Sequence, residues 1–539
     1  MKRIIKGSPV SGGIAVGEFY ILSRESSEIP EFCGESPEKG LQMLCLAREK
    51  ADGQLRELSE KASREGLRDA AALFEVHRQL LQDPDFTEAA EALILEGKSP
   101  AYAVREAGES FAAVFAALED PYLRERGRDI RDLARRVCGI LLGEAEPAPL
   151  GPGPYILAAE DLSPSETLLL DRSKIGGFAL VKGSPLSHTA LLSRSMGVPC
   201  VMALGDSSLL EEKGKTAVLN GNTGELFLDP DAACLQAFQE AEAAQKAERT
   251  ALLALRELPC EDPKGERILL YTNISSPEEA EESLRVGADG VGLCRSEFLF
   301  RGREAPGEEE QLALYRKLLS AMEGRPLTVR TFDIGSDKGA AWMPMEAEAN
   351  PALGLRGIRL SLRYPEILRT QFNALLRAGS YGKVRIMLPM IADRKELSAA
   401  REILEDCKAA LKAKGLPFDE KIPLGVMIET PAAALVSDLL AEEADFFSIG
   451  SNDLTQYCLA ADRQNPVLAG SFSHGNEAVL RLIRLTLQNA KVRGIPVSLC
   501  GEAAADPAMT KVLLDAGLRA FSLVPAGLLP LKKRILTLK

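Results

Sequence analysis

Eight short apolar runs, mostly separated by helix-patterned segments, occupy the second half of this 539-residue chain. The runs lie at 268–273, 290–295, 327–333, 384–390, 424–430, 446–453, 497–502 and 520–524. Strands that alternate with helices in this way form a parallel sheet. Eight such units predict a closed (β/α)₈ TIM-type barrel, whereas the competing architecture, an open doubly wound sheet, more often has fewer strands.

Polar side chains follow these predicted strands at their C-terminal ends, where barrels of this type place their active sites. The residues concerned are Arg295, Arg330, Asp333, Glu429, Asn452, Asp453, Cys500 and Glu502. Arg356 and Arg359 are three residues apart and share one face if their segment is helical.

Several arginines near two carboxylates are typical of a site for a small polyanion with a divalent cation. Glu429 and Asp453 are the predicted metal ligands. Two protein ligands are few for a metal ion. Mg²⁺ suits such a site, because it retains water molecules and accepts substrate oxygens as further ligands. The alternative is that these charges form structural ion pairs at the barrel rim.

Cys500 ends the seventh run and precedes Gly501 and Glu502. A thiol at this position is a nucleophile, a proton donor or a buried spacer. No histidine lies nearby in the sequence, and its charged neighbours are acidic. A proton donor therefore fits better than an activated thiolate.

The first half of the chain divides into three parts. Residues 25–145 carry helix-period apolar positions and predict a helical bundle, and a Pro- and Gly-rich stretch follows them. Residues 1–24 and 146–230 predict one small α/β domain into which the bundle is inserted. Residues 231–257 predict a linking helix, which leaves 258–539 for the barrel.

His188 is one of 3 histidines in the chain and lies between Ser187 and Thr189. Ser187 can cap a helix that runs to Ser195 and stops at Gly197. The first turn of a helix favours a neutral imidazole and stabilises an anion bound to it. His188 is therefore a candidate phosphoryl acceptor with Thr189 in support, although a histidine that merely packs near a helix cap is the alternative.

Composition narrows the class of protein further. The formal net charge of −13 disfavours nucleic-acid binding. The ten cysteines are scattered singly and are expected to be free thiols, and no run is long enough to span a bilayer, so the expected location is cytoplasmic.

The chain closely resembles the Enzyme I family of the bacterial phosphotransferase system, the phosphoenolpyruvate-protein phosphotransferases. The motifs that carry this resemblance run through most of the chain: Gly12-Gly-Ile-Ala-Val-Gly, Phe74-Glu-Val-His-Arg-Gln-Leu-Leu-Gln-Asp-Pro, Leu186-Ser-His-Thr-Ala, Gly287-Ala-Asp-Gly-Val-Gly-Leu-Cys-Arg-Ser-Glu-Phe-Leu-Phe, Asn350-Pro-Ala-Leu-Gly-Leu-Arg-Gly-Ile-Arg, Phe446-Phe-Ser-Ile-Gly-Ser-Asn-Asp-Leu-Thr-Gln-Tyr and Cys500-Gly-Glu.

The resemblance implies a mechanism. Phosphoenolpyruvate would bind in the barrel with Mg²⁺ on Glu429 and Asp453, and Cys500 would protonate the enolate to give pyruvate. His188 would become a tele-phosphohistidine and pass its phosphoryl group to the phosphocarrier protein HPr. The residues that would hold the substrate are Arg295, Arg330, Arg356, Asn452, Asp453 and Arg463.

The resemblance also implies how the parts work together. The α/β domain would carry the phosphohistidine and swing about the stretch 231–257, the helical bundle around His77 would dock HPr, and the barrels would form a homodimer. Without a preceding sensor domain, the sugar-uptake branch is favoured over the nitrogen branch.

Two alternatives follow from the same residues. A pyruvate phosphate dikinase or phosphoenolpyruvate synthase needs an ATP-grasp domain, for which a bundle of about a hundred residues is too small. A regulatory protein that lost catalysis would have no reason to retain His188, Cys500, Glu429 and Asp453 together.

Overall fold

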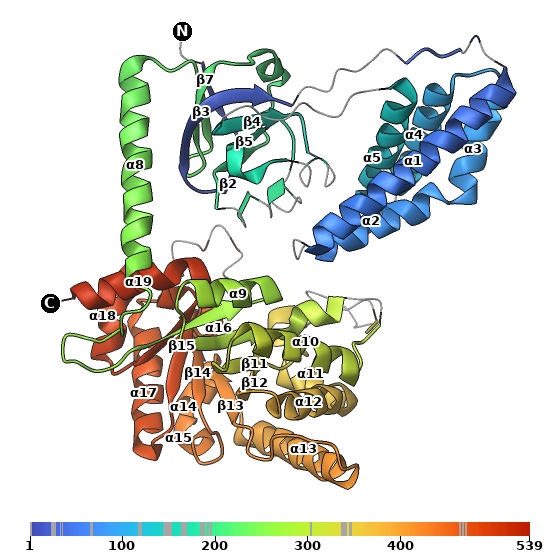
Figure 1. Ribbon diagram of the computed structural model, residues 1–539. Helices are drawn as coiled ribbons and strands as arrows, with labels where there is room; N and C mark the ends of the chain where they lie inside the picture. The colour runs from blue at the N-terminus through green and yellow to red at the C-terminus, as the bar shows by residue number, and fades with distance from the viewer. Residues whose placement is uncertain are drawn as a thin grey trace. The chain divides into compact units, whose positions relative to one another are not determined.

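A computed structural model describes the chain as two compact units, Met1–Glu248 and Arg249–Lys539 (Figure 1). The residues that it describes are 3–22, 29–32, 34, 36–64, 68–116, 121–143, 153–162, 166, 170–183, 189–190, 193–194, 197–301, 304–335, 342–343, 348–462, 465, 468 and 472–538.

The first unit contains an eight-stranded sheet in the order β1-β8-β7-β3-β4-β5-β6-β2. Its strands are β1 (Arg3–Lys6), β2 (Ser8–Ser11), β3 (Ile14–Ile21), β4 (Tyr155–Ala159), β5 (Ile175–Leu180), β6 (Cys200–Met202), β7 (Thr216–Asn220) and β8 (Glu225–Leu228). β3 and β4 are parallel neighbours, with Phe19 opposite Ile156, although more than a hundred residues separate them in the chain. Apolar side chains from both faces of the sheet form buried clusters.

Among the described residues, five helices lie between β3 and β4 in the sequence. They are α1 (Pro37–Arg64), α2 (Arg68–Leu81), α3 (Pro84–Leu95), α4 (Pro100–Ala116) and α5 (Pro121–Leu142). Their apolar positions recur at the helical period, so the helices bury a common core that includes Leu55, Phe74 and Ile94. Asp83 begins α3 by accepting a hydrogen bond from the Asp85 amide, with Pro84 in the first turn, where proline costs no hydrogen bond.

Helix α8 (Ala232–Ala254) follows the sheet and has no buried residue. Near its C-terminal part, Gln245 accepts a hydrogen bond from the Ile14 amide at 3.1 Å. Leu252 packs against the core of the second unit, and the carbonyl of Arg256 accepts a hydrogen bond from Lys532 at 2.8 Å. Gln245 thus contacts the sheet of the first unit, and Leu252 contacts the core of the second.

The second unit is a closed parallel barrel, which confirms the (β/α)₈ prediction over the open sheet (Figure 1). Its strands are β9 (Leu269–Ile274), β10 (Gly290–Arg295), β11 (Leu327–Arg330), β12 (Val384–Leu388), β13 (Leu424–Ile428), β14 (Phe447–Gly450), β15 (Val497–Cys500) and β16 (Ala520–Leu523), and β16 pairs with β9 to close the ring. The strands are almost entirely buried, as expected for a parallel sheet covered by helices.

Helices connect these strands around the outside. They are α9 (Pro277–Arg285), α10 (Glu308–Ala321), α11 (Ile358–Arg363), α12 (Pro365–Gly379), α13 (Arg394–Ala413), α14 (Pro431–Leu435), α15 (Ser437–Leu440), α16 (Ser451–Leu459), α17 (Glu477–Arg493), α18 (Pro507–Asp515) and α19 (Pro525–Thr537). Local sequence fixes several of their starts. Asp393 and Glu396, for example, form a reciprocal capping box at the beginning of α13.

The helices of the described part of the chain include none with the length and apolar character needed to cross a membrane. Among the described elements, the longest connections from a barrel strand to the next α-helix follow β10 and β11. Arg295, Arg330, Glu429 and Cys500 lie at the end of a strand or directly after it, and Asp453 lies in the first turn of α16.

Candidate active site

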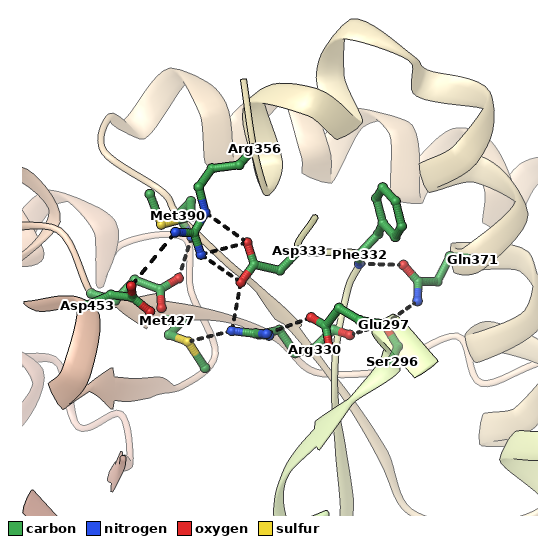
Figure 2. Close-up of polar contacts among 11 residues, drawn as sticks. Ser296, Glu297, Arg330, Phe332, Asp333, Arg356, Gln371, Met390, Met427 and Asp453 are labelled. Carbon is green, nitrogen blue, oxygen red and sulfur yellow. Dashed lines mark hydrogen bonds and ion pairs between the residues drawn. The ribbon is translucent and has the colours of Figure 1, made fainter. Parts of the chain in front are cut away.

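Two buried arginines share one carboxylate at the end of β11 (Figure 2). Nη1 of Arg330 lies 2.9 Å from Oδ2 of Asp333, and Nη2 of Arg356 donates to Oδ2 of Asp333 at 3.1 Å and to Oδ1 at 3.3 Å. Asp333 is only 2% exposed. The carboxylate therefore fixes both guanidinium groups before any ligand binds.

Additional acidic groups compensate the burial of these arginines. Nη2 of Arg330 donates to Oε1 of Glu297 at 2.6 Å, while Nη1 lies 3.9 Å from the sulfur of Met427. Burial alone would lower the pKa of Arg330, but Glu297, Asp333 and Glu429 raise it well above its ordinary value. Burial likewise opposes the charge on Arg356, and Asp333 is the main group that raises its pKa. Both arginines therefore stay protonated.

Arg356 does not share a helix face with Arg359, because helix α11 begins only at Ile358. Arg356 points toward Asp333, and its Nη1 lies 3.8 Å from Asp453 (Figure 2). The same Nη1 also donates to the hydroxyl of Tyr457 at 3.2 Å. Arg359 instead lies 3.8 Å from Glu396. The expectation of a helical arginine pair was therefore wrong, and Arg356 alone joins the buried cluster.

Glu429 and Asp453 are buried carboxylates at the ends of β13 and β14. Glu429 accepts a hydrogen bond from the Met390 amide at 2.6 Å, and burial, followed by Asp453 and Asp333, raises the pKa of Glu429 to about 8. Oδ1 of Asp453 is buried and has no hydrogen-bond partner within the described residues. Two carboxylates that repel each other, one of them with a buried oxygen that accepts no hydrogen bond within the described residues, fit a divalent cation.

The protein supplies few ligands for such a cation. Within the part of the chain that the structure describes, no group of three or more His, Cys, Asp or Glu side chains could hold a metal ion. A cation on Glu429 and Asp453 would complete its coordination with water or substrate oxygens, as Mg²⁺ commonly does.

Cys500 lies inside the barrel at the end of β15. It is 3% exposed and packs with Leu293, Met387, Met427 and Phe446. Its thiol lies 3.5 Å from the carbonyl oxygen of Ile449, and the Ser448 hydroxyl lies 3.7 Å from the sulfur. Burial raises the pKa of Cys500 to about 11, so that the group carries its proton at neutral pH.

Asn452 and Glu502 connect the loops that follow β14 and β15. The side-chain amide of Asn452 donates to Glu502 at 3.2 Å, and its oxygen accepts from the Glu502 backbone amide at 2.9 Å. Arg295 is exposed at the end of β10, where it is in register with Arg330. The Arg295 charge is close enough to lower the pKa of Cys500, against the larger effect of burial.

The structure thus brings Arg330, Arg356, Glu429 and Asp453 into one charged cluster. His188 and Arg463 lie outside the described residues, as does the predicted cap Ser187. Thr189 is described, and its hydroxyl is buried without a hydrogen-bond partner among the described residues.

His77 is buried in α2. Its Nε2 lies 3.7 Å from Asp129, and its ring meets that of Phe74 edge to face at 6.2 Å between centroids.

Sequence reasoning gave no role to several residues of the cluster. Asp333 was noticed at a strand end, but its part in holding two arginines depends on the loop that brings Arg356 to it. Glu297 and Tyr457 lie in motifs that carry the family resemblance, but nothing in the sequence assigns a partner to either residue.

Three family models match the chain. They describe the N-terminal domain of PEP-utilising enzymes over residues 6–126, the mobile domain over 151–224 and the PEP-binding domain over 249–539. The last of these alone covers more than half of the 539 residues.

Curated relatives resemble the chain over almost its whole length. A multiphosphoryl transfer protein of Xanthomonas campestris is 40% identical over 98% of this chain, which spans 63% of that longer protein. A phosphoenolpyruvate-protein phosphotransferase of Priestia megaterium is 37% identical over 99% of this chain and 94% of its own length. The protein of the same name from Bacillus subtilis is 36% identical over 98% and 94%.

These comparisons confirm the family predicted from the motifs and favour neither a dikinase nor a non-catalytic regulator. The chain is an enzyme of the PEP-utilising family, and within it the chain belongs to the phosphoenolpyruvate-protein phosphotransferases.

Proposed function

We propose that this enzyme transfers the phosphoryl group of phosphoenolpyruvate to its own His188 and then to a histidine of a small phosphocarrier protein, HPr, with release of pyruvate. The family supports the reaction, and one structural observation carries the assignment of the site. Inside the barrel, the Asp333 carboxylate holds the guanidinium groups of Arg330 and Arg356 in place. Beside them lie two carboxylates that could bind a divalent cation, and the Cys500 thiol nearby is buried and remains protonated.

The arginines would bind a small dianion or trianion. Arg330 and Arg356 present fixed positive charge, and Arg295 adds an exposed guanidinium at the next strand end. Planar guanidinium groups suit both carboxylate and phosphate oxygens. Arg295, Arg330, Arg356, Arg463, Asn452 and Asp453 are the proposed substrate-binding residues.

Glu429 and Asp453 would hold Mg²⁺. When bound, the ion neutralises phosphate charge and so lowers the barrier to transfer. Two features support this pair: Oδ1 of Asp453 is buried without a hydrogen-bond partner among the described residues, and the neighbouring carboxylates raise the pKa of Glu429.

The proposed chemistry has two parts. Nε2 of His188 forms a bond to phosphorus as the bond between phosphorus and the enol oxygen breaks, and the electron pair stays on the oxygen. Cys500 then gives its proton to the terminal carbon of the enolate, which yields pyruvate and a thiolate that is reprotonated from water. Burial supports this role, because it keeps the thiol protonated until a strong carbon base is present.

The remaining parts of the proposal concern domains and partners. The α/β sheet domain would carry Thr189 and His188 as a swinging unit, with the hinge in the stretch 231–257. Helices α1 to α5 would dock HPr, the barrels would form a homodimer, and the enzyme would act in the cytoplasm as the first step of sugar uptake.

The direct test is a steady-state assay with the purified chain, Mg²⁺, phosphoenolpyruvate and HPr. The proposal expects one pyruvate for each phosphorylated HPr, with no requirement for ATP. Phosphorylation that depends on ATP, or pyruvate release without phosphorylation of HPr, would overturn it.

A further inference from the structure

His474 is the third histidine of the chain, and no role for it follows from the proposed chemistry. It lies between α16 and α17, and its side chain is only 11% exposed. The ring meets Phe472 edge to face, with centroids 5.3 Å apart. Burial lowers the pKa of His474 despite the opposing charges of Glu502 and Asp506, so the ring is neutral at pH 7 and carries a single N–H.

The position of that hydrogen follows from its partner. Nδ1 of His474 lies 2.9 Å from the hydroxyl of Thr455, and this hydroxyl also lies 2.7 Å from the carbonyl oxygen of Ser451. A carbonyl can only accept, and a hydroxyl has one hydrogen to give. With Thr455 donating to Ser451, its hydroxyl can only accept from Nδ1, which makes His474 the donor toward α16. The Ser451 backbone is a second hydrogen-bond partner of the His474 ring.

The other ring nitrogen faces the loop after β15. Nε2 of His474 lies 4.0 Å from the Glu502 carboxylate, whose side chain is 76% exposed. This separation is beyond hydrogen-bond distance, so Nδ1 makes the stronger contact.

The segment that His474 contacts is the first turn of α16, which carries two proposed site residues. Ser451 and Thr455 are fully buried in this turn, on either side of Asn452 and Asp453. The Ser451 hydroxyl also donates to the carbonyl of Cys500 at 2.8 Å. A change in the turn would therefore move both the substrate-binding pair and the end of β15.

We propose that His474 is a positioning residue: by donating from Nδ1 to Thr455, it holds the first turn of α16 so that Asn452 and Asp453 meet the substrate in the correct geometry. This inference rests on the proposed function, since it presumes that phosphoenolpyruvate binds at that turn. His474 itself touches no reacting atom.

Two amide variants test which ring nitrogen matters. The amide nitrogen of Asn in His474→Asn can stand near the position of Nδ1, whereas that of Gln in His474→Gln reaches the position of Nε2. We expect His474→Asn to keep the KM for phosphoenolpyruvate within about threefold of the unmodified enzyme and His474→Gln to raise it about tenfold or more, with a smaller change in kcat. Equal KM values for the two variants would overturn the inference. So would a rise in KM that correlates with a lower melting temperature and does not depend on which ring nitrogen the amide replaces.

A double-mutant cycle tests the contact itself. Thr455→Val removes the acceptor and leaves the ring in place, so it should raise the KM by a similar factor, and adding His474→Gln should not raise it further. The matched control is Thr486→Val, because Thr486 is also fully buried and makes the same hydroxyl-to-carbonyl bond, to Leu482 at 2.9 Å, in α17. If the KM of the double variant rises by the product of the two single factors, the two side chains act independently, and this would contradict the inference.

Failure of a variant to fold and failure of the proposed function can both be told apart from failure of the role of His474. If His474→Gln does not fold, Thr455→Val must still raise the KM on its own, and an unchanged KM would overturn the inference. If the unmodified enzyme releases no pyruvate from phosphoenolpyruvate, the proposed function fails; if it does and the variants match it, only the role of His474 fails.

Discussion

The carboxylate of Asp333 binds the guanidinium group of Arg356 through both of its oxygens, at 3.1 and 3.3 Å. The same carboxylate lies 2.9 Å from Arg330, so that one buried acid fixes two buried bases. Donors that are already in place lose little freedom when a charged ligand arrives. Asp333 therefore organises the site although it need not touch the substrate.

Replacing Asp333 with Asn should destabilise the barrel strongly. The change leaves Arg330 and Arg356 buried with one negative charge fewer, and breaking a buried pair in this way costs about 3–5 kcal/mol of the free energy of unfolding. Urea denaturation measures the effect. The control is Asp406→Asn, which removes an exposed partner of Arg369 and should cost about 0–1 kcal/mol. Equal losses for the two variants would show that Asp333 does not support the arginines.

Replacing Arg356 with Lys should weaken catalysis while the charge is kept. An ammonium group cannot contact both oxygens of Asp333 and the Tyr457 hydroxyl in the geometry of the guanidinium fork. The loss of one charged hydrogen bond, about 1.5–3 kcal/mol, should lower kcat/KM for phosphoenolpyruvate on the order of 10–100-fold. Arg359→Lys, three residues later and outside the cluster, should stay within about twofold. A similar effect at both positions would be incompatible with this assignment.

The pH dependence of pyruvate formation should reflect the buried thiol of Cys500. Burial raises the pKa of Cys500 to about 11, so the proton-donating form is complete below that pH and is lost only as the pH rises through it. We expect the rate at which solvent deuterium enters the methyl group of pyruvate to show no decline from thiol ionisation up to pH 10. A decline centred near pH 9, the value for an ordinary thiol, would contradict this.

Replacing Cys500 with Ser tests whether the thiol is the proton donor. A hydroxyl is a much weaker acid than a thiol, so Cys500→Ser should slow deuterium incorporation about 10²–10⁴-fold. Cys407→Ser is the control, because Cys407 is also buried and its pKa is also raised to about 11 by burial, but it lies on α13. A comparable loss in both variants would indicate a packing effect.

Replacing Asp453 with Asn should reduce the affinity for Mg²⁺. The substitution replaces one of the two carboxylates at the proposed metal position with a neutral amide, which is a weaker ligand for a divalent cation. We expect the Mg²⁺ concentration for half-maximal activity to rise on the order of 100-fold, and direct binding of Mn²⁺ to weaken in parallel. Asp438→Asn, an exposed acid on α15, serves as the control. Unchanged Mn²⁺ binding in Asp453→Asn would place the metal elsewhere.

The sequence predicted the barrel well because each strand carries its own signal. An apolar run such as 424–428 needs no distant partner to be identified as a buried strand, and the polar residue after it marks the strand's end. The strand-end rule therefore placed Arg330, Glu429, Asp453 and Cys500 near strand ends without structural information.

Long-range contacts explain what the sequence could not predict. Arg356 lies just before the start of α11, where it contacts Asp333 and Tyr457. Glu297 and His474 act on residues far away in the chain, and nothing in the local pattern identifies those partners. Such pairings depend on loop conformation, which periodicity does not encode.

The transfer of a phosphoryl group to His188 is the central claim, and one labelling experiment tests it most directly. The purified enzyme is incubated with ³²P-labelled phosphoenolpyruvate and Mg²⁺, without HPr, and the labelled peptide is identified by mass spectrometry. The account predicts an acid-labile, base-stable label on His188 that is absent from His188→Ala. No such label in the unmodified enzyme, or a label that persists in His188→Ala, would contradict it.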